Sequence, residues 1–278
     1  MKDTFEKKII IVTGGTSGIG YALSEALLKR GAYVWVIGSR QESIEKAKQS
    51  LIEYPNARFA AVDVTDAEAV QKMVDNCVNE FGRLDYLFNN AGIGMMGQSE
   101  DMTLDIWKKV VDVNMWGVIY GVHAALPVML KQESGHIVNT ASIAGLFSRP
   151  YKAVYTATKY AVKSMTESMR YEHVGRGTGI AFSTVCPGNV VTNIFDGIQI
   201  PKDAVPINEA TEIILAGVEK KEGLIIFPEY SKKLIEHLNA NPDDMEKFMI
   251  ELERRTRVTY LEKGELYAEL PHDIIQIK

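Results

Sequence analysis

The chain has 278 residues, 46% of them apolar and 24% charged, an ordinary globular balance that suffices for one large domain or two small ones. The formal net charge is −5, and lysine and arginine are scattered along the chain without a basic cluster. These features argue against nucleic acid and anionic membranes as partners and favour small molecules.

The only cysteines, Cys77 and Cys186, lie far apart, with no CxxC pair and no histidine cluster beside them. This pattern argues against a disulfide framework and against a metal site, and it fits a reducing compartment. The first apolar run, Ile9–Val12, is too short for the core of a signal peptide or for a transmembrane helix. We therefore expect a soluble, cytoplasmic protein without membrane insertion.

Short apolar runs rich in valine, isoleucine and aromatic residues recur along the chain. They are continuous rather than alternating, as is typical of strands buried on both faces of a parallel sheet. Seven strands are expected, at residues 9–12, 33–37, 59–62, 84–88, 135–139, 180–185 and 224–227.

Segments between these runs, such as residues 21–29, 43–53 and 67–80, carry apolar residues every three or four positions, the period of an amphipathic helix. Parallel neighbours need crossover connections, and helices must then cover both faces of the sheet. The pattern predicts an α/β fold, a Rossmann-type doubly wound seven-stranded parallel sheet.

The strand and helix alternation covers residues 1–230 without a linker or repeat, so we expect one main domain there. Pro242 then provides a helix start, and the apolar residues that follow it share one helical face. These residues are Met245, Phe248, Met249 and Leu252. Residues 231–278 are expected to form a helical C-terminal extension packed on the same domain or on a partner subunit, with a lid over the substrate as the alternative.

A glycine-rich stretch, TGGTSGIG, joins the first expected strand to the first expected helix at residues 13–20. Glycines at such a junction let the backbone approach a pyrophosphate, whose charge is met by amide N–H groups and the helix dipole. The first gap is longer than in the general G-x-G-x-x-G pattern. The stretch predicts a dinucleotide site, with a tight turn that binds no ligand as the alternative. Its expected members are Gly14, Thr16, Ser17, Gly18, Ile19 and Gly20.

The second expected strand ends in Ser39 and Arg40, and no carboxylate appears before Glu42. NAD-specific folds usually place a carboxylate here to hold the ribose hydroxyls, whereas an arginine can pair with a 2′-phosphate. Ser39 and Arg40 therefore favour NADP(H) over NAD(H) as the cofactor. The alternative is that Arg40 is only a surface residue at the start of the next helix.

Further motifs follow in order: NNAG at residues 89–92, Asn114 in VDVNMWG, Ser142 in IVNTASIAG, and Tyr155-x-x-x-Lys159. With residues 13–20, they make the chain similar to the single-domain short-chain dehydrogenase/reductase family over about residues 5–230. The resemblance implies that residues 1–230 are a dinucleotide-binding catalytic domain that interconverts a carbonyl and a secondary alcohol. Two departures are the last strand, which reads LIIFPE rather than ending in Asp-Gly-Gly, and the long segment that follows it.

The stretch YKAVYTATKY at residues 151–160 contains several tyrosine and lysine residues that could form a pair. Helical spacing places Tyr155 and Lys159 on one face. Rival pairs are Lys152 with Tyr155 and Tyr160 with Lys163. Ser142 ends a strand, and the first turns of the helix that follows lie nearest that ligand-binding edge, which favours Tyr155. The family pattern names the same residue.

A phenol has a pKa of about 10, so Tyr155 needs a cationic neighbour to exchange protons at neutral pH. Lys159 can supply that charge, while Ser142 would hydrogen-bond the substrate oxygen. The resemblance implies that Lys159 also holds the nicotinamide ribose and that Asn114 anchors a water linking Lys159 to solvent.

The resemblance also assigns residues along the nucleotide. Asp63 would lie near the adenine amino group with Val64 beside the ring, and the segment from Pro187 would close over the nicotinamide. The cofactor-binding residues expected on this basis are Asp63, Val64, Asn90, Ala91, Gly92, Tyr155, Lys159, Pro187, Gly188, Val190 and Thr192.

Apolar residues around the expected site predict a hydrophobic substrate, such as a steroid-like or long-chain carbonyl compound. They are Met95, Met96, Ile143, Leu146, Phe147, Ile194, Phe195, Ile198, Ile200 and Val205. Packing in the core or a subunit contact is the alternative interpretation of these residues. Alternative functions are an NAD-dependent alcohol or hydroxysteroid dehydrogenase of the same fold and a non-catalytic cofactor-binding regulatory protein. The resemblance implies a homodimer or homotetramer formed through helices around residues 106–126 and 155–174.

Overall fold

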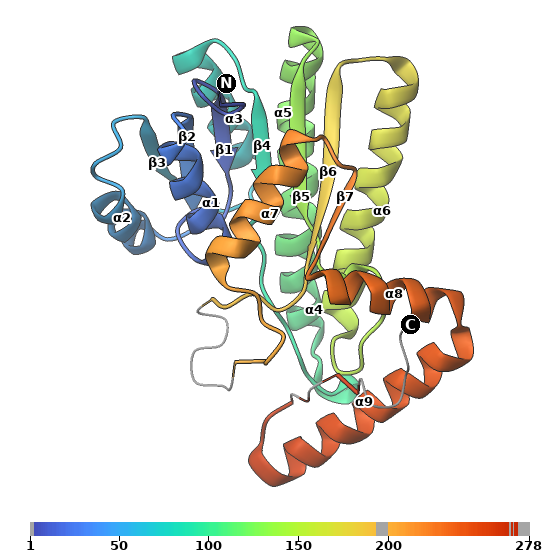
Figure 1. Ribbon diagram of the computed structural model, residues 1–278. Coiled ribbons are helices and arrows are strands. Elements are labelled where there is room, and N and C mark those ends of the chain that lie inside the picture. The colour runs from blue at the N-terminus through green and yellow to red at the C-terminus, as the bar shows by residue number, and fades with distance from the viewer. Residues whose placement is uncertain (1–2, 193–199, 267, 269, 272–278) are drawn as a thin grey trace.

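The computed structural model describes residues 3–192, 200–266, 268, 270 and 271. Its centre is a seven-stranded parallel sheet in the order β3-β2-β1-β4-β5-β6-β7 (Figure 1). The strands are β1 Ile9–Val12, β2 Tyr33–Gly38, β3 Ala57–Ala61, β4 Tyr86–Asn89, β5 Gly135–Thr140, β6 Ile180–Pro187 and β7 Leu224–Phe227. The strand order reverses between β1 and β4, where doubly wound folds bind their ligands. The predicted fold class is confirmed.

Helices cover both faces of the sheet. On one face lie α1 Gly18–Lys29, α2 Gln41–Ser50 and α7 Ile207–Glu219; on the other lie α3 Ala67–Phe81, α5 Gly117–Gln132 and α6 Ala153–Arg176. Alternate residues of a strand face alternate layers: Ile10 and Val12 contact the α1 and α7 layer, while Ile11 contacts the opposite one. Burial on both sides explains why the strands read as continuous apolar runs.

Two strands start at residues other than those predicted, and the ends of β2 to β6 differ from the prediction by one or two residues. β3 starts earlier, at Ala57, because its first residue already pairs with Val34 of β2. β4 starts later, at Tyr86. The carboxylate of Asp85, the residue before it, accepts a hydrogen bond from the amide of Ile9, 2.9 Å away. The Asp85 side chain therefore adds to the backbone hydrogen bonds that Asp85 already makes with Ile9 and His136.

The long helix expected around residues 106–126 is interrupted. α4 Leu104–Val111 meets α5 through a π-helical turn, Asp112–Trp116, that contains Asn114. By length and composition the run Leu104–Gln132 could cross a membrane, but 44% of its apolar window is buried inside the fold. Val118 and Val122 pack in the core beneath the sheet, so this run is a core helix.

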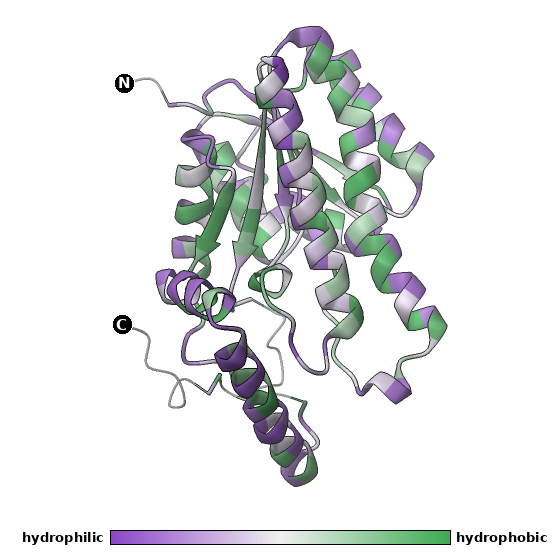
Figure 2. Ribbon diagram, turned by 90° about the vertical axis from the view of Figure 1, so that its right-hand side faces the viewer, coloured by the Kyte–Doolittle hydropathy of each residue, from purple (hydrophilic) through white to green (hydrophobic). Residues whose placement is uncertain are grey.

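The C-terminal extension forms α8 Glu229–Ala240 and α9 Pro242–Lys263, beyond the end of the sheet at which β7 finishes (Figure 1). Phe248 and Leu252 of α9 pack against Leu234 and Leu238 of α8. Hydrophilic residues predominate along α9 (Figure 2), although Ile250 and Leu261 are exposed.

Part of α9 also reaches the body of the domain. Met245 and Met249 pack against Ile143 and Phe147. Ile143 belongs to a short 3₁₀ turn, Ile143–Gly145, and Ser99–Asp101 forms another such turn. The extension therefore contacts the segment that directly follows Ser142.

Candidate active site

Tyr155 and Lys159 lie on one face of α6, in its first two turns. The Lys159 ammonium is 5.6 Å from the centre of the Tyr155 ring. It also donates a hydrogen bond to the backbone carbonyl of Thr140, the last residue of β5, at 2.9 Å. The structure thus brings the end of β5 and the start of α6 together around the phenol.

Ser142 lies two residues beyond the end of β5 and is buried. Its hydroxyl accepts a hydrogen bond from the amide of Ala144 at 3.1 Å and donates one to the carbonyl of Pro187, the last residue of β6, at 3.4 Å. These contacts fix the hydroxyl at the carboxyl edge of the sheet, beside Tyr155.

The surroundings of Tyr155 act on its acidity in opposite directions. Burial raises the pKa of the phenol, while the Ser142 hydroxyl and the Arg149 guanidinium act to lower it. Burial also lowers the pKa of Lys159 to about 8. A lysine with a pKa brought closer to neutrality, next to a phenol that contacts a serine hydroxyl, is typical of a site that moves protons.

Asn114 is fully buried in the π-helical turn, and its amide is engaged on both sides. The amide oxygen accepts from the Ile93 N–H at 2.8 Å, and the amide nitrogen donates to the Ile93 carbonyl at 3.0 Å. A side chain at Gly92 would meet both the Asn114 oxygen and the Lys159 ammonium within 3.5 Å. Asn114 therefore lies near Lys159 and holds the loop after β4.

The glycine-rich turn after β1 is shaped for a close approach. Gly14 and Gly18 both adopt positive φ, +64° and +52°, a region that favours glycine. A Cβ at Gly14 would lie 2.9 Å from the Cα of Ala91. The Thr13 hydroxyl accepts hydrogen bonds from the amides of Asn90 and Ala91, at 3.0 and 3.1 Å, so the turn is tied to the end of β4.

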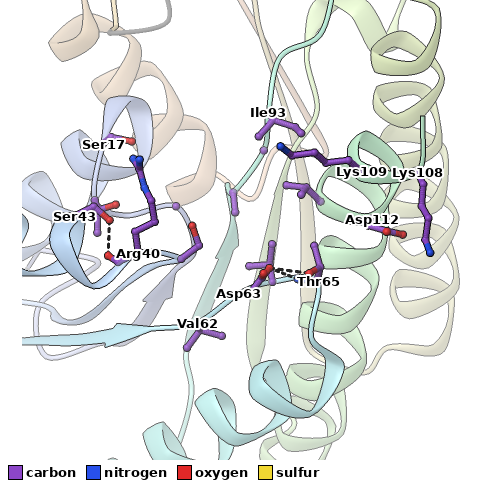
Figure 3. A pocket seen from close by; sticks show the side chains of 18 of the residues that line it. Ser17, Arg40, Ser43, Val62, Asp63, Thr65, Ile93, Lys108, Lys109 and Asp112 are labelled. Atoms are coloured by element: carbon purple, nitrogen blue, oxygen red, sulfur yellow. Dashed lines mark hydrogen bonds between the residues drawn. The ribbon is translucent and has the colours of Figure 1, made fainter. Parts of the chain in front are cut away.

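A cavity of about 560 Å³ opens at the carboxyl ends of β1, β2 and β4 (Figure 3). Nine of the residues predicted to bind cofactor line it: Gly14, Thr16, Ser17, Ser39, Arg40, Asp63, Val64, Ala91 and Gly92. The Arg40 side chain points toward Ser17 on one wall (Figure 3). Glu42 is not part of this lining and pairs with Lys46 at 2.7 Å. Glu42, the first carboxylate in sequence after β2, is thus engaged by a lysine outside the cavity lining.

The other predicted cofactor residues lie outside that lining. Gly18, Ile19, Gly20 and Asn90 belong to the turn and to its support, and Tyr155 and Lys159 lie at the sheet edge described above. Val190 is buried and bridges Val205, while a Cβ at Gly18 would lie 3.6 Å from Thr192. Pro187 contacts Ser142, as described, and Gly188 hydrogen-bonds the carbonyl of Phe227.

One wall of the cavity was missed by the sequence reasoning. Helix α4 and the turn after it contribute four charged residues, two of each sign (Figure 3). They are Asp105, Lys108, Lys109 and Asp112. Their helical spacing directly before Asn114 is a signal that could have identified this face.

The apolar wall expected around the substrate is only partly present. Val205 and Phe147 are core residues, 5% and 1% exposed, because Val205 packs beneath α7 and Phe147 packs against α8 and α9. Ile143 is buried with Phe147, and Leu146 packs against the same cluster. Met95 and Met96 are half-buried, and Ile200 is exposed. Ile194, Phe195 and Ile198 lie outside the described residues.

Comparison with known proteins agrees with this geometry. A family model described as short chain dehydrogenase matches residues 8–202. The chain belongs to the short-chain dehydrogenase/reductase family. As a member of that family it is an oxidoreductase that acts between alcohol and carbonyl groups with a nicotinamide cofactor.

The sequences of individual relatives align with about two thirds of this chain. An uncharacterized oxidoreductase of Staphylococcus saprophyticus is 39% identical over 192 residues, which are 69% of this chain and 78% of the relative. A 3beta-hydroxysteroid dehydrogenase 2 of Eggerthella lenta is 35% identical over 196 residues, 69% of this chain and 75% of the relative.

Solved structures resemble the dehydrogenase along most of its length. A short-chain dehydrogenase/reductase from Burkholderia phymatum in complex with NAD superposes with a TM-score of 0.80 at 26% identity, covering 87% of this chain and 96% of the other. ElxO with NADP bound gives a TM-score of 0.72 at 28% identity, covering 79% of this chain and 97% of the other. The two neighbours thus differ in the nicotinamide cofactor.

The residues present fit such a cofactor. Gly14 and Gly18 adopt positive φ angles that favour glycine, and their lack of side chains leaves the turn open to a bound pyrophosphate. The cavity that continues from this turn carries a cation at Arg40 and hydroxyls at Ser17 and Ser39. Lys159 lies just outside the lining, beside Gly92, where it would hold a ribose.

Proposed function

We propose that this protein is an NADP(H)-dependent oxidoreductase that interconverts a carbonyl and a secondary alcohol on a hydrophobic substrate, of the steroid-like or long-chain kind. The observation that carries the proposal is the convergence of Ser142, Tyr155 and Lys159 at one sheet edge, with the Lys159 ammonium 5.6 Å from the Tyr155 ring. A non-catalytic cofactor-binding protein would have no need for this arrangement.

Each of the three side chains has a distinct role in the reduction. The Ser142 hydroxyl hydrogen-bonds the substrate oxygen and orients the carbonyl. The neutral Tyr155 phenol donates its proton to that oxygen. A nicotinamide held beside Lys159 would supply the hydride that the reduction requires. Lys159 stabilises the resulting phenolate and holds the nicotinamide ribose. Asn114, beside Lys159, anchors the water through which the proton is replaced.

The residues on one wall of the cavity favour NADP(H) over NAD(H) as the cofactor. Arg40 and the hydroxyls of Ser39 and Ser43 line the cavity where β2 ends. An arginine here can form charge-assisted hydrogen bonds to a 2′-phosphate. Of the lining carboxylates, Asp63 accepts hydrogen bonds from the amide and hydroxyl of Thr65. The remaining proposed cofactor contacts follow the family pattern. They are Gly14, Thr16, Ser17, Gly18, Ile19, Gly20, Asp63, Val64, Asn90, Ala91, Gly92, Tyr155, Lys159, Pro187, Gly188, Val190 and Thr192.

An NAD-dependent dehydrogenase of the same fold is the second candidate. The NAD complex of the Burkholderia phymatum neighbour favours it. Arg40 is exposed, so it can also turn away from the cavity. In that case the enzyme would run toward alcohol oxidation.

The hydrophobic substrate rests on two supports. The first is the Eggerthella lenta relative, whose name describes a hydroxysteroid dehydrogenase. The second is the half-buried pair Met95 and Met96 after β4, because methionines adapt to apolar ligands. We also propose a homodimer or homotetramer in the cytoplasm. Exposed aromatic residues on α4 and α6, including Trp107, Tyr160 and Tyr171, support pairing through these helices.

A cofactor titration tests the proposal. NADPH and NADH are added to the wild type, to Arg40→Ala and to Arg58→Ala, and the fluorescence of the bound reduced nicotinamide is followed. Arg58 is a matched control because it lies on the neighbouring strand β3 and pairs with Glu80. We expect NADPH to bind more tightly than NADH, and Arg40→Ala alone to weaken NADPH about 10- to 100-fold. Equal binding of both cofactors with no effect of Arg40→Ala would favour the NAD enzyme.

A further inference from the structure

Two cations near Tyr155 have no contact with substrate or cofactor in the chemistry described above. Arg149 and Lys152 lie in the segment between Ser142 and α6, with Lys152 at the residue directly before the helix begins. Tyr155 follows Lys152 by three positions, and Lys159 follows Tyr155 by four. These spacings put the three residues on one face at the start of the helix.

The Tyr155 ring has an ammonium group near it from each direction along the helix. Lys152 Nζ lies 5.7 Å from the ring centre and Lys159 Nζ 5.6 Å from it. Arg149 is close enough for its guanidinium to act electrostatically on both Tyr155 and Lys152. Three cationic side chains are therefore gathered around the group that handles the substrate oxygen.

The charge of Lys152 is not balanced within the described part of the chain. No described carboxylate forms an ion pair with Lys152. Although its side chain keeps some contact with solvent, burial, followed by the Arg149 guanidinium, lowers the pKa of Lys152 to about 7. An ammonium group that is held partly away from water beside another cation is costly unless an anion joins it, so the position of Lys152 is typical of a binding site.

The backbone that carries these cations is held in place from two sides. Tyr151 has a φ of +62°, an uncommon angle for a residue with a side chain. Its carbonyl accepts a hydrogen bond from the Gly97 amide at 2.9 Å, and its hydroxyl donates to Glu253 of α9 at 2.8 Å. Such a conformation persists only where the surroundings impose it, and it occurs often at ligand sites.

We propose that Lys152 and Arg149 bind an anionic group of the substrate, a carboxylate close to the carbonyl on which Tyr155 acts. The substrate class then narrows to oxo acids and hydroxy acids with an apolar chain. Because Lys152 lies against the Tyr155 ring, the carboxylate would be a few bonds from the reacting carbon. This inference rests on the proposed oxidoreductase function and adds a substrate class to it.

A rival role for Lys152 is to act on Tyr155 alone, as a second charge that favours phenolate. The two roles differ in what they predict for the substrate. A carboxylate site affects the KM of acidic substrates and leaves neutral ones unchanged. A charge that acts on Tyr155 alone affects kcat for acidic and neutral substrates equally.

The test compares 2-, 3- and 4-oxooctanoate with their methyl esters, following NADPH and NADH consumption. We expect at least one acid to exceed its ester about 10- to 100-fold in kcat/KM, the range for a hydrogen bond between charged groups. Lys152→Met should abolish this preference by raising KM for the acid, and Lys152→Arg should retain most of it. The control is Lys163→Met on the same helix, where the lysine pairs with Glu167 at 2.6 Å.

A binding measurement tests the carboxylate site separately from the proposed oxidoreductase function. Titration calorimetry of octanoate and octanamide into the NADP-saturated protein should show octanoate binding that Lys152→Met weakens about tenfold or more. Equal turnover of acids and esters, an equal fall in kcat for both in Lys152→Met, or no octanoate binding to the wild type would overturn the carboxylate site. Ketone reduction in any of these cases leaves the oxidoreductase intact, whereas failure of both nucleotides to bind refutes the oxidoreductase itself.

Discussion

The ammonium group of Lys159 lies 5.6 Å from the centre of the Tyr155 ring and is anchored by the Thr140 carbonyl. Both side chains disfavour their charged forms, because burial raises the pKa of the phenol and lowers the pKa of the lysine. The burial that suits Tyr155 and Lys159 for proton exchange therefore lowers the free energy of unfolding when either group is charged.

This arrangement predicts a pH-dependent stability. The pKa of Lys159 is about 8 in the folded protein and 10.5 in its ordinary state. Between these values the unfolded chain holds the proton and the folded chain does not, so raising the pH favours folding. From about pH 8 to about pH 10.5, the free energy of unfolding of the wild type should therefore rise relative to Lys159→Met. Urea denaturation without cofactor measures this, and a pH-independent difference between the two proteins would contradict the account.

Asn114 should be important for folding as well as for chemistry. Asn114→Asp keeps an acceptor for the Ile93 N–H but loses the donor to the Ile93 carbonyl, and the site is fully buried. We expect a loss of about 1–3 kcal/mol in the free energy of unfolding. Asn79→Asp, at an exposed position of α3, is the control and should change it by less than about 0.5 kcal/mol. Similar losses in the two variants would mean that the Ile93 contacts contribute little.

The C-terminal extension should unfold together with the sheet. Phe248 is fully buried between α8 and α9, so Phe248→Ala should cost about 3–5 kcal/mol. Ile250 on the same helix is 61% exposed, and Ile250→Ala should have a small effect. Calorimetry distinguishes the outcomes: one transition shifted to lower temperature is expected for Phe248→Ala. A separate low-temperature transition would show instead that residues 231–278 fold independently.

Much of the fold was readable from the sequence because burial on both faces of a parallel sheet leaves continuous apolar runs. The glycines of residues 13–20 and the spacing of Tyr155 and Lys159 were readable for a similar reason, since local geometry limits which residues can stand there. Strand ends were harder to predict. The apolar run that begins at Leu84 suggested a strand start there, but β4 begins at Tyr86, and the Asp85 carboxylate before it accepts a hydrogen bond from the Ile9 amide.

Features that depend on distant contacts could not be read in the same way. The hydrogen bond between Tyr151 and Glu253 joins residues 102 positions apart, and it brings α9 beside the site. Phe147 resembles a substrate contact in sequence but packs against Ile235, Met245 and Met249 instead. A role for Lys152 in binding could be inferred only from the distance between its ammonium group and the Tyr155 ring.

The most direct test of the proposed chemistry is single-turnover reduction of a carbonyl substrate by the wild type and by Tyr155→Phe. Both proteins are saturated with NADPH, and nicotinamide fluorescence first shows that binding is equal. We expect Tyr155→Phe to lower the rate of NADPH oxidation about 10²- to 10⁴-fold, because it removes the proton donor and leaves the ring in place. A Tyr155→Phe protein that binds NADPH normally and reduces the carbonyl at the wild-type rate would contradict the account.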